Sequence, residues 1–399
     1  YDIYNNIAIG DYSNSKIYFG GGGNFGYGYI IESKTLSRNV YSCGLGTIGK
    51  LGHGNINSCN FPTPIDALAY SNIVAISAGN NHSLFLAKNG NVYSCGSDND
   101  GQLGRTSYYN IPMQITETIG SSNIVAISTG GSHSLFLDEN RNVYSCGSVS
   151  EGQLGRTEKD NDIPIQITIT IGSSNIVAIS AGGSHSLFLD INGNVYSCGR
   201  YDYGQLGREV LQDAYKPLQI TETIGSSNIV AISAGYYHSL FLAENGKVYS
   251  CGLGTAGQLG HGNITSYNFP TPIDALVDSN IVAISASGSH SLFLAKNGNV
   301  YSCGRYNYDQ LGRTVEDYNY NIPIQITETI GNSNIVAISA GSFHSLFLAE
   351  NGNVYSCGTG GTYNYGQLGH GEHTNNYNFP TLIDALVDSN IVAISAGHN

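Results

Sequence analysis

Four short apolar segments recur in a fixed order along the chain, with polar and glycine-rich stretches between them. The first reads Asn-Ile-Val-Ala-Ile-Ser, the second His-Ser-Leu-Phe-Leu, the third Val-Tyr-Ser-Cys-Gly, and the fourth contains proline, as in Ile111–Ile115. Each segment is rich in β-branched and aromatic residues and is bounded by Gly, Asn or Ser, which is typical of a β-strand. The pattern predicts a tandem repeat of about 50 residues that contains four strands, here named A to D.

The residues between these segments indicate how the four strands pair. Asn89-Gly90 and its equivalents lie between strands B and C, and this dipeptide favours a type I′ hairpin. Proline cannot donate a hydrogen bond to a neighbouring strand, so strand D is expected at the outer edge. Strand A is almost continuously apolar and is expected innermost. Such antiparallel units repeated around an axis predict an all-β fold, a seven-bladed β-propeller.

The two ends of the chain are expected to share one blade of a single propeller domain. Strand A recurs at Asn390–Ser395 with no B strand after it. Near the N-terminus, Asn6–Ile9 and Lys16–Phe19 align weakly with strands A and B, with Ser15 at the histidine position and Gly20–Gly28 as an irregular excursion. We expect the C-terminal strand to close the ring there; alternatively, the natural chain continues beyond its last residue here. The expected blades are 1–68 with 390–396, 72–115, 123–167, 175–220, 228–276, 280–326 and 334–386.

Composition and charge exclude several classes of function. The net charge is −13 and no Lys or Arg run is present, which argues against direct nucleic-acid binding. No stretch of 18 apolar residues and no signal peptide is visible, so we expect no membrane interaction. Seven of the eight cysteines recur once per repeat, too far apart to form disulfides with one another. These thiols predict a reducing, intracellular compartment, the cytoplasm or the nucleus.

Three of the recurring motifs together resemble the regulator of chromosome condensation repeat family. They are Gly-x-x-His-Ser from Gly79 to Ser83, Asn-Gly-x-Val-Tyr-Ser-x-Gly from Asn89 to Gly96, and Gly-Gln-Leu-Gly from Gly101 to Gly104. The resemblance covers almost the whole chain and implies a seven-bladed propeller. Members include a nucleotide exchange factor for the GTPase Ran, a plant ultraviolet-B photoreceptor and many protein-binding modules. This chain lacks the photoreceptor's tryptophans and shows no basic tail or projecting insertion of the exchange factor, so no exchange residue is transferred.

One histidine precedes Ser-Leu in each of six repeats, and we interpret these histidines as structural. A buried imidazole that bonds the backbone of the next turn avoids the cost of an unpaired polar group, about 1–3 kcal/mol. No Cys-x-x-Cys or His-Glu-x-x-His motif and no Ser, His and Asp grouping stands out. We therefore expect no metal, no cofactor and no enzymatic activity. The six residues are His82, His133, His185, His238, His290 and His344.

One face of the predicted propeller carries the variable loops. In an A–B–C–D meander, the A–B and C–D loops emerge on one face, and the B–C and D–A connections on the other. The B–C turns are nearly identical, whereas the C–D loops vary and, with the A–B loops, form an acidic, tyrosine-rich face. Tyrosine is favoured at protein interfaces; the alternative is a set of solvated turns with a compositional bias. The candidate partner-binding residues are Asp98, Asp100, Glu151, Tyr201, Asp202, Tyr203, Tyr236, Tyr237, Tyr306, Tyr308, Asp309, Phe343, Tyr363 and Tyr365.

Three functions compete on this evidence. The leading hypothesis is a protein-interaction or assembly platform that uses this face to bind an uncharged or basic protein surface. The second is a regulator of a small GTPase of the guanine nucleotide exchange type, which rests on the family resemblance. An enzyme is the third, and no asymmetric acid–base pair favours it. Self-association is compatible with the first hypothesis.

Overall fold

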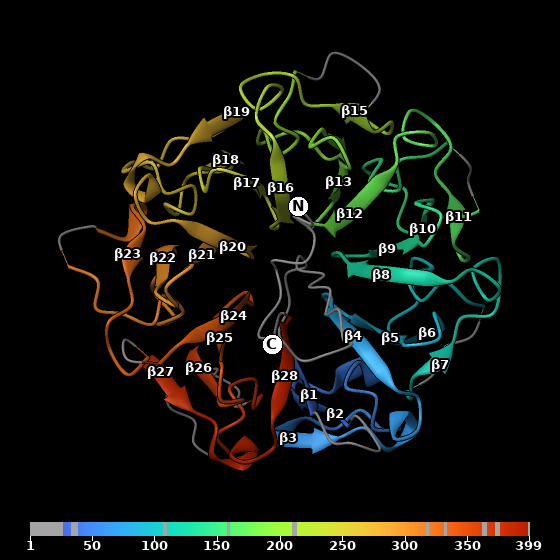
Figure 1. Ribbon diagram of the computed structural model, residues 1–399. Helices are drawn as coiled ribbons and strands as arrows, with labels where there is room; N and C mark the ends of the chain where they lie inside the picture. The colour runs from blue at the N-terminus through green and yellow to red at the C-terminus, as the bar shows by residue number, and fades with distance from the viewer. Residues whose placement is uncertain are drawn as a thin grey trace.

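A computed structural model gives the arrangement of the chain. It describes residues 39–106, 110–157, 160–209, 214–316, 319–330, 333–360, 365–371 and 376–397, together with the backbone of 27–32. These residues form a ring of four-stranded antiparallel sheets, in which strand A lies nearest the central axis and strand D at the outer rim (Figure 1). No helix among them is long and apolar enough to cross a membrane.

Six sheets, named blades 2 to 7, are each built by one continuous segment of chain, in the order A, B, C, D. Blades 2, 3 and 4 contain β4 (Ile73–Ala78), β5 (His82–Ala87), β6 (Val92–Gly96), β7 (Met113–Gln114), β8 (Ile124–Thr129), β9 (His133–Asp138), β10 (Val143–Gly147), β11 (Ile165–Gln166), β12 (Ile176–Ala181), β13 (His185–Asp190), β14 (Val195–Gly199) and β15 (Leu218–Gln219). Blades 5, 6 and 7 contain β16 (Ile229–Ala234), β17 (His238–Ala243), β18 (Val248–Gly252), β19 (Tyr267–Pro272), β20 (Ile281–Ala286), β21 (His290–Ala295), β22 (Val300–Gly304), β23 (Ile324–Gln325), β24 (Ile335–Ala340), β25 (His344–Ala349), β26 (Val354–Gly358) and β27 (Tyr377–Leu382). The helices in the described part are 3₁₀ turns: η2 (Thr47–Gly49), η3 (Asp66–Leu68), η4 (Asp274–Leu276), η5 (Asn319–Asn321) and η6 (Asp384–Leu386).

The count of blades from the sequence needs a correction. Only six sheets in the described residues contain a complete A-to-D run of chain; the remaining sheet has the order β28-β1-β2-β3 and takes its strands from both ends. Its strands are β28 (Ile391–Ala396), β1 (Tyr27–Glu32), β2 (Val40–Gly44) and β3 (Cys59–Pro64). The count of seven blades is therefore replaced by six continuous blades and one composite sheet, named blade 1. The antiparallel pairing of β28 with β1 joins the two ends of the chain.

The strands expected at the N-terminus also need a correction. Asn6–Ile9 and Lys16–Phe19 lie outside the described residues, and the A and B positions of blade 1 are taken by β28 and β1. The expected excursion at Gly20–Gly28 therefore includes the start of β1. The poorly matched residues 27–32 were missed because their sequence, Tyr-Gly-Tyr-Ile-Ile-Glu, lacks the His-Ser-Leu-Phe-Leu motif of every other B strand.

The pairing register shows which residues of β1 replace that motif. Tyr27 lies opposite Gly44 and Gly28 lies opposite Cys43. In blade 2 the residues opposite the equivalent glycine and cysteine are His82 and Ser83. Tyr27 therefore stands at the histidine position, which had been assigned to Ser15, and a glycine stands at the serine position.

The hydrophobic core lies between neighbouring blades. Alternate side chains of a strand point to opposite faces of its sheet. In β5, Leu84 and Leu86 pack with Phe136 of blade 3, whereas Phe85 packs against residues of blade 1. Around the ring, each B strand of blades 3 to 7 likewise packs its leucines against the next blade and its phenylalanine against the previous one. Each buried leucine or phenylalanine stabilises the contact between two neighbouring blades, here called a blade joint, by about 1.5–3 kcal/mol. All eight cysteines are described, none forms a disulfide, and seven are buried in this core.

A hydrogen-bond relay also joins each blade to the next. His82 Nε2 lies 2.9 Å from Ser134 Oγ of blade 3, and this hydroxyl donates to the Gln102 carbonyl oxygen at 2.7 Å. Because a hydroxyl has one hydrogen, the imidazole must donate its Nε2–H. The expected partner was the backbone of the next turn, and the structure shows a serine side chain instead. Four further pairs have the same 2.9 Å distance: His133–Ser186, His185–Ser239, His238–Ser291 and His290–Ser345.

His344 is the exception in this relay. The next sheet is blade 1, where Gly28 stands at the serine position and has no hydroxyl group. Among the described residues, both ring nitrogens of His344 are buried without a hydrogen-bond partner. The joint between blades 7 and 1 therefore lacks a polar contact that the other histidine-bearing joints have.

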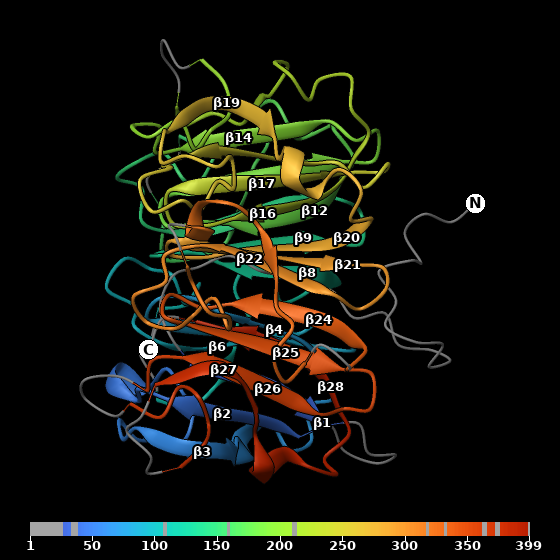
Figure 2. The same cartoon turned by 90° about the vertical axis from the view of Figure 1, so that its left-hand side faces the viewer.

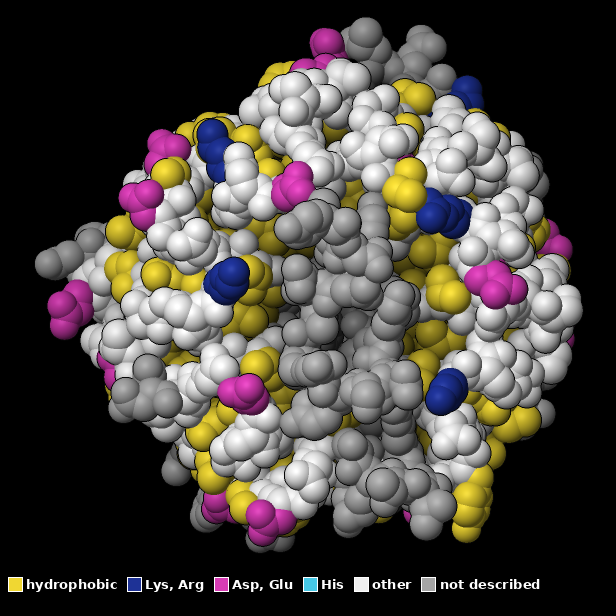
Figure 3. Space-filling model, viewed as in Figure 1, with side chains coloured by type: hydrophobic (Ala, Val, Ile, Leu, Met, Phe, Trp, Pro, Cys, Tyr) yellow, Lys and Arg dark blue, Asp and Glu magenta, His cyan; other side chains and the backbone are white. Residues whose placement is uncertain are grey.

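The two faces of the ring differ in their connections. The A–B and C–D loops form one face, here named the loop face, which lies on the left of Figure 2. The B–C hairpins and D–A connections form the opposite hairpin face, on which Figures 1 and 3 look down. Charged side chains are scattered over the hairpin face and form no single patch in Figure 3. The C–D loops, which differ in sequence and length from blade to blade, lie on the loop face.

Candidate functional site

The loop face carries a cluster of aromatic side chains around Arg200, which directly follows β14. The Arg200 guanidinium lies over the rings of Tyr203 and Tyr237, 5.4 and 5.7 Å from their centroids. These two rings are 4.8 Å apart, and Tyr236 contacts Tyr237 edge-on at 4.3 Å. This cluster 4/5 joins the C–D loop of blade 4 to the A–B loop of blade 5.

A second cluster with the same design lies two blades further along the ring. The Arg305 guanidinium lies 4.9 Å from the centroid of the Tyr308 ring, which packs edge-on against Phe343 at 4.7 Å. Beside it, the rings of Tyr306 and Tyr320 are 5.0 Å apart. This cluster 6/7 joins the C–D loop of blade 6 to the A–B loop of blade 7.

A tight turn aims the tyrosine of each C–D loop back at its arginine. In blade 4 the Gly204 N–H donates to the Tyr201 carbonyl at 2.9 Å, and Gly204 has a φ of +83°, which favours glycine. The Tyr203 N–H donates to the buried Gln205 side chain at 3.0 Å. The Gly-Gln-Leu-Gly motif thus holds the loop in place and presents the aromatic ring above the neighbouring blade.

Burial and charge set the chemistry of cluster 4/5. Burial, with a smaller contribution from Tyr236, raises the pKa of Tyr237 to about 12, so this phenol is protonated at neutral pH. Arg200 Nε lies 2.9 Å from the carboxylate of Asp202. The two side chains are 29% and 51% exposed, so solvent screens this pair and its contribution is small. The cluster is held mainly by aromatic packing.

Two of the acidic residues predicted to contact a partner, Asp98 and Asp309, instead accept hydrogen bonds from residues of the loops. Asp98 accepts a hydrogen bond from the Leu103 N–H at 3.0 Å, and burial raises the pKa of its carboxyl to about 6. Asp309 accepts a hydrogen bond from the Asn376 amide at 3.0 Å. Asp202 and Glu151 are exposed and Asp100 is half-buried. Fewer acids of this face are therefore available to a partner than the sequence suggested.

The predicted aromatic residues divide by exposure. Tyr201 and Tyr306 are 51% and 41% exposed, and each lies beside one of the two clusters. The half-buried members are Tyr203, Tyr236, Tyr237, Tyr308, Phe343 and Tyr365. Tyr363 lies outside the described residues. The arrangement offers two exposed rings, each supported by a packed Arg–aromatic cluster.

Sequence reasoning missed the two arginines at the centres of these clusters. The signal was present, because arginine follows the strand C glycine in only two repeats. These read Gly-Arg-Tyr-Asp-Tyr at Gly199–Tyr203 and Gly-Arg-Tyr-Asn-Tyr at Gly304–Tyr308. The aromatic residue before the histidine of the next blade completes each cluster, and that pairing depends on contacts between blades.

Lys50 is a third residue that the sequence reasoning missed. It stands in blade 1 where the six other repeats have a glutamine, five of them in Gly-Gln-Leu-Gly and blade 6 in Asp-Gln-Leu-Gly. Its side chain is 2% exposed, its ammonium donates to the Asn80 carbonyl oxygen at 3.3 Å, and burial lowers its pKa to about 8. A charged group in this place is costly to desolvate.

Lys50→Gln is expected to stabilise the protein at pH 7 by about 1–3 kcal/mol, because it removes the cost of burying an ammonium group. The unfolded lysine keeps its proton up to a pKa of about 10.5, whereas the folded lysine loses it above about 8. The wild-type protein therefore gains stability from this group between pH 8 and 10.5, and the advantage of the variant should shrink there. Denaturant unfolding of both proteins across this range measures it; an advantage that does not change with pH would contradict this assignment.

The described residues contain no group of three or more His, Cys, Asp or Glu side chains that could hold a metal ion. The six histidines at the blade joints are fully buried, and burial lowers the pKa of five of them to about 3 and that of His344 to about 4. Five of the six donate to a serine, as described above. What the loop face can do chemically is to bind a surface through aromatic and charged contacts.

Fold and sequence comparisons place this ring in a known family. A family model described as the RCC1-like domain matches residues 39–399, and the chain belongs to this family. The ultraviolet-B receptor UVR8 of Arabidopsis thaliana is 30% identical over 350 residues, which cover 87% of this chain and 78% of that protein. The human E3 ubiquitin-protein ligase HERC2 is 30% identical over 367 residues, which cover 90% of this chain but 7% of HERC2.

Solved structures show the same architecture. Prp20p from Saccharomyces cerevisiae, described together with its binding to Gsp1p and histones, is 26% identical with a TM-score of 0.78. The alignment covers 89% of this chain and 87% of that chain. Human WBSCR16 is 21% identical with a TM-score of 0.74, covers 90% of this chain and 94% of its own, and shows the fold alone.

Proposed function

We propose that this protein is a non-enzymatic protein-interaction platform that binds its partner on the loop face. The observation that carries the proposal is the pair of Arg–aromatic clusters on that face, each with an exposed tyrosine beside it. Tyrosine and arginine dominate the binding energy of protein interfaces. Because packing already orders Tyr203 and Tyr308, little conformational entropy is lost when a partner covers them.

The charge of the protein favours a basic or uncharged partner surface. The chain has a net charge of −13, and Glu151 and Asp202 are exposed on the loop face. Such acids steer association with a basic surface and lose influence as salt is added. Replacing them should therefore slow association more than it speeds dissociation.

Regulation of a small GTPase is the second candidate, and the likeness to Prp20p favours it, since that protein is described as binding Gsp1p. The test is the rate of GDP release from a Ran-type GTPase with and without this protein. The platform proposal predicts no acceleration, and an acceleration of tenfold or more would favour the exchange reaction instead.

The double variant Tyr201→Ser with Tyr306→Ser tests the platform directly. Both side chains are exposed, so the fold should tolerate the change, whereas Tyr203 and Tyr308 are half-buried and unsuitable. We expect at least tenfold weaker binding of the partner captured from the native source, which corresponds to about 1.4 kcal/mol or more. Biolayer interferometry with the purified partner measures it.

Val277→Ser is the control, because Val277 is 57% exposed and directly follows η4 in a D–A connection on the hairpin face. It should leave partner binding within twofold of the wild type. Equal melting temperatures of all three proteins would show that the fold is intact. Native affinity in the double variant would contradict the proposal.

A further inference from the structure

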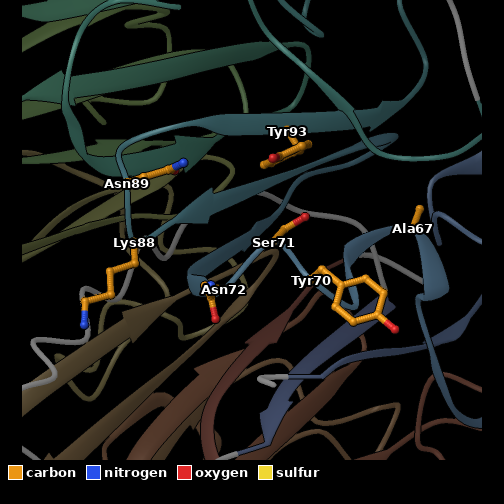
Figure 4. A pocket seen from close by; sticks show the side chains of 7 residues that line it. All are labelled: Ala67, Tyr70, Ser71, Asn72, Lys88, Asn89 and Tyr93. Atoms are coloured by element: carbon orange, nitrogen blue, oxygen red, sulfur yellow. The ribbon is translucent and has the colours of Figure 1, made fainter. Parts of the chain in front are cut away.

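A pocket of about 480 Å³ lies on the hairpin face, at the corner between blades 1 and 2. Its lining includes Tyr70, Asn72, Lys88, Asn89 and Tyr93. Figure 4 shows Asn72 between Lys88 and Tyr70, with Asn89 and Tyr93 across the opening. Tyr70, Asn72 and Lys88 are all exposed, so a ligand can reach them from solvent.

Three other blades show what the asparagine at this position binds. In blade 3 the Asn123 amide donates to the carboxylate of Glu139, which lies on the B–C hairpin, at 2.8 Å. Blades 5 and 7 repeat this contact at the same distance. The pairs are Asn228–Glu244 and Asn334–Glu350. The fold therefore builds a carboxylate contact at this place from its own residues in three blades.

Blade 2 keeps the frame of this contact and lacks the carboxylate. The Lys88 N–H donates to the Asn72 carbonyl oxygen at 3.0 Å, as the Glu139 N–H donates to the Asn123 carbonyl oxygen at 2.9 Å. The side chain on the hairpin is an ammonium group here instead of a carboxylate. Within the described ranges, the Asn72 side chain makes no hydrogen bond and Lys88 makes no ion pair.

Blade 6 shares the lysine but differs in the adjoining loop. The Lys296 N–H donates to the Asn280 carbonyl oxygen at 3.0 Å, in the same backbone frame. Its D–A connection carries Asp278 two residues before Asn280, where the blade 2 corner has Tyr70. The corner between blades 1 and 2 thus combines the lysine with Tyr70 in the adjoining connection, where blade 6 has the acid Asp278.

We propose that this corner binds a carboxylate group supplied by another molecule. The Asn72 amide and the Lys88 ammonium would contact the two carboxylate oxygens. Hydrogen bonds to an ionised group are stronger than hydrogen bonds between neutral groups. Tyr70 and Tyr93 flank the opening and would cover the aliphatic carbons next to the carboxylate. The carboxylate comes from an acidic side chain of a protein segment or from a free dicarboxylic acid. The site is independent of the loop face.

Titration of the ¹⁵N-labelled full chain distinguishes these two sources. The probes are the peptide acetyl-Gly-Glu-Glu-Gly-amide, its Gln-Gln counterpart and glutarate. We expect a saturable shift of the Asn72 side-chain amide resonances, assigned by their absence in Asn72→Asp, with the acidic peptide and none with the Gln-Gln peptide. Saturation by the acidic peptide alone identifies a protein segment as the source, and saturation by glutarate as well identifies a free organic acid.

Lys88→Glu is the decisive variant, because it recreates the residue of blades 3, 5 and 7. The introduced carboxylate should occupy the Asn72 amide, and binding of the probe should weaken at least tenfold. Lys296→Glu, the matched change in blade 6, should leave binding within twofold. If Lys88→Glu does not fold, Asn72→Asp replaces the amide donor with a repelling carboxylate of the same shape and should cause the same loss.

Two results would overturn the proposal. One is the absence of any shift at Asn72 with either acidic probe up to about 10 mM, where even weak sites fill. The other is an undiminished shift in Lys88→Glu. Neither result bears on the loop face, because partner binding there is measured with different variants.

Discussion

Lowering the pH from 7 to 5 is expected to remove most of the free energy of unfolding. Six histidines lie fully buried at the blade joints, and burial lowers the pKa of five to about 3 and of His344 to about 4. In the unfolded chain each takes up a proton near pH 6.5. Below that pH the unfolded state therefore binds more protons than the folded state, and stability falls as the pH falls.

The size of this effect follows from the number of imidazoles. Each one costs about 1.4 kcal/mol per pH unit between its unfolded and folded pKa values, so six cost about 8 kcal/mol per unit. A folded domain is stable by only about 5–15 kcal/mol in total. Urea unfolding at a series of pH values between 7 and 5 should give a slope that steepens as the pH falls and that corresponds, near pH 5, to the uptake of nearly six protons by these histidines.

His344→Gln provides a control for this prediction. Neither ring nitrogen of His344 has a hydrogen-bond partner among the described residues, so its loss should disturb the relay least. The uptake should then fall by about one proton. An uptake of two protons or fewer in the wild type would show that the histidines are not buried at the joints as described.

Deleting residues 390–399 is expected to destabilise the fold strongly and to weaken its cooperativity. This segment contains β28, which pairs with β1 and packs between blades 7 and 2. Ile391 and Ile394 are 4% and 3% exposed, and their burial with that of neighbouring alanines is worth about 5 kcal/mol or more. Thermal unfolding followed by circular dichroism should show a lower and broader transition.

Deletion of residues 398–399 alone is the control, because it leaves β28 complete. A synthetic peptide of residues 389–397, added to the chain that lacks residues 390–399, should raise the melting temperature of that chain. The peptide contains the sequence of β28 and can pair with β1 in its place. A truncated protein with the melting curve of the full chain would refute closure of the ring by β28.

Most of the fold could be predicted from sequence because the repeat is nearly uniform. The short apolar and aromatic composition of His-Ser-Leu-Phe-Leu predicted a strand, and Asn-Gly predicted the hairpin after it. The composite blade could be predicted only in part. Its B strand, Tyr27–Glu32, lacks the motif, and pairing with β2 and β28 defines it. Tertiary contacts override local sequence signals at such a position.

The candidate site could be predicted less well. The order of strands placed the variable loops on one face, but the sequence did not show that Tyr203 and Tyr308 pack on Arg200 and Arg305. It also did not show that the Asp98 carboxylate accepts a hydrogen bond from the Leu103 N–H in the same loop. Both depend on distances across a turn or between blades. The pairing of Asn123 with Glu139 likewise depends on the register of two paired strands in blade 3.

Hydrogen–deuterium exchange of the partner complex tests the central claim most directly. If the loop face is the binding surface, the partner should slow exchange in the segments 200–204, 235–238, 305–309 and 341–344, which carry the Arg–aromatic contacts of the two clusters. Exchange at the B–C hairpins of blades 3 and 5, residues 139–142 and 244–247, should be unchanged. Protection confined to those hairpins, with the cluster segments unaffected, would contradict the account.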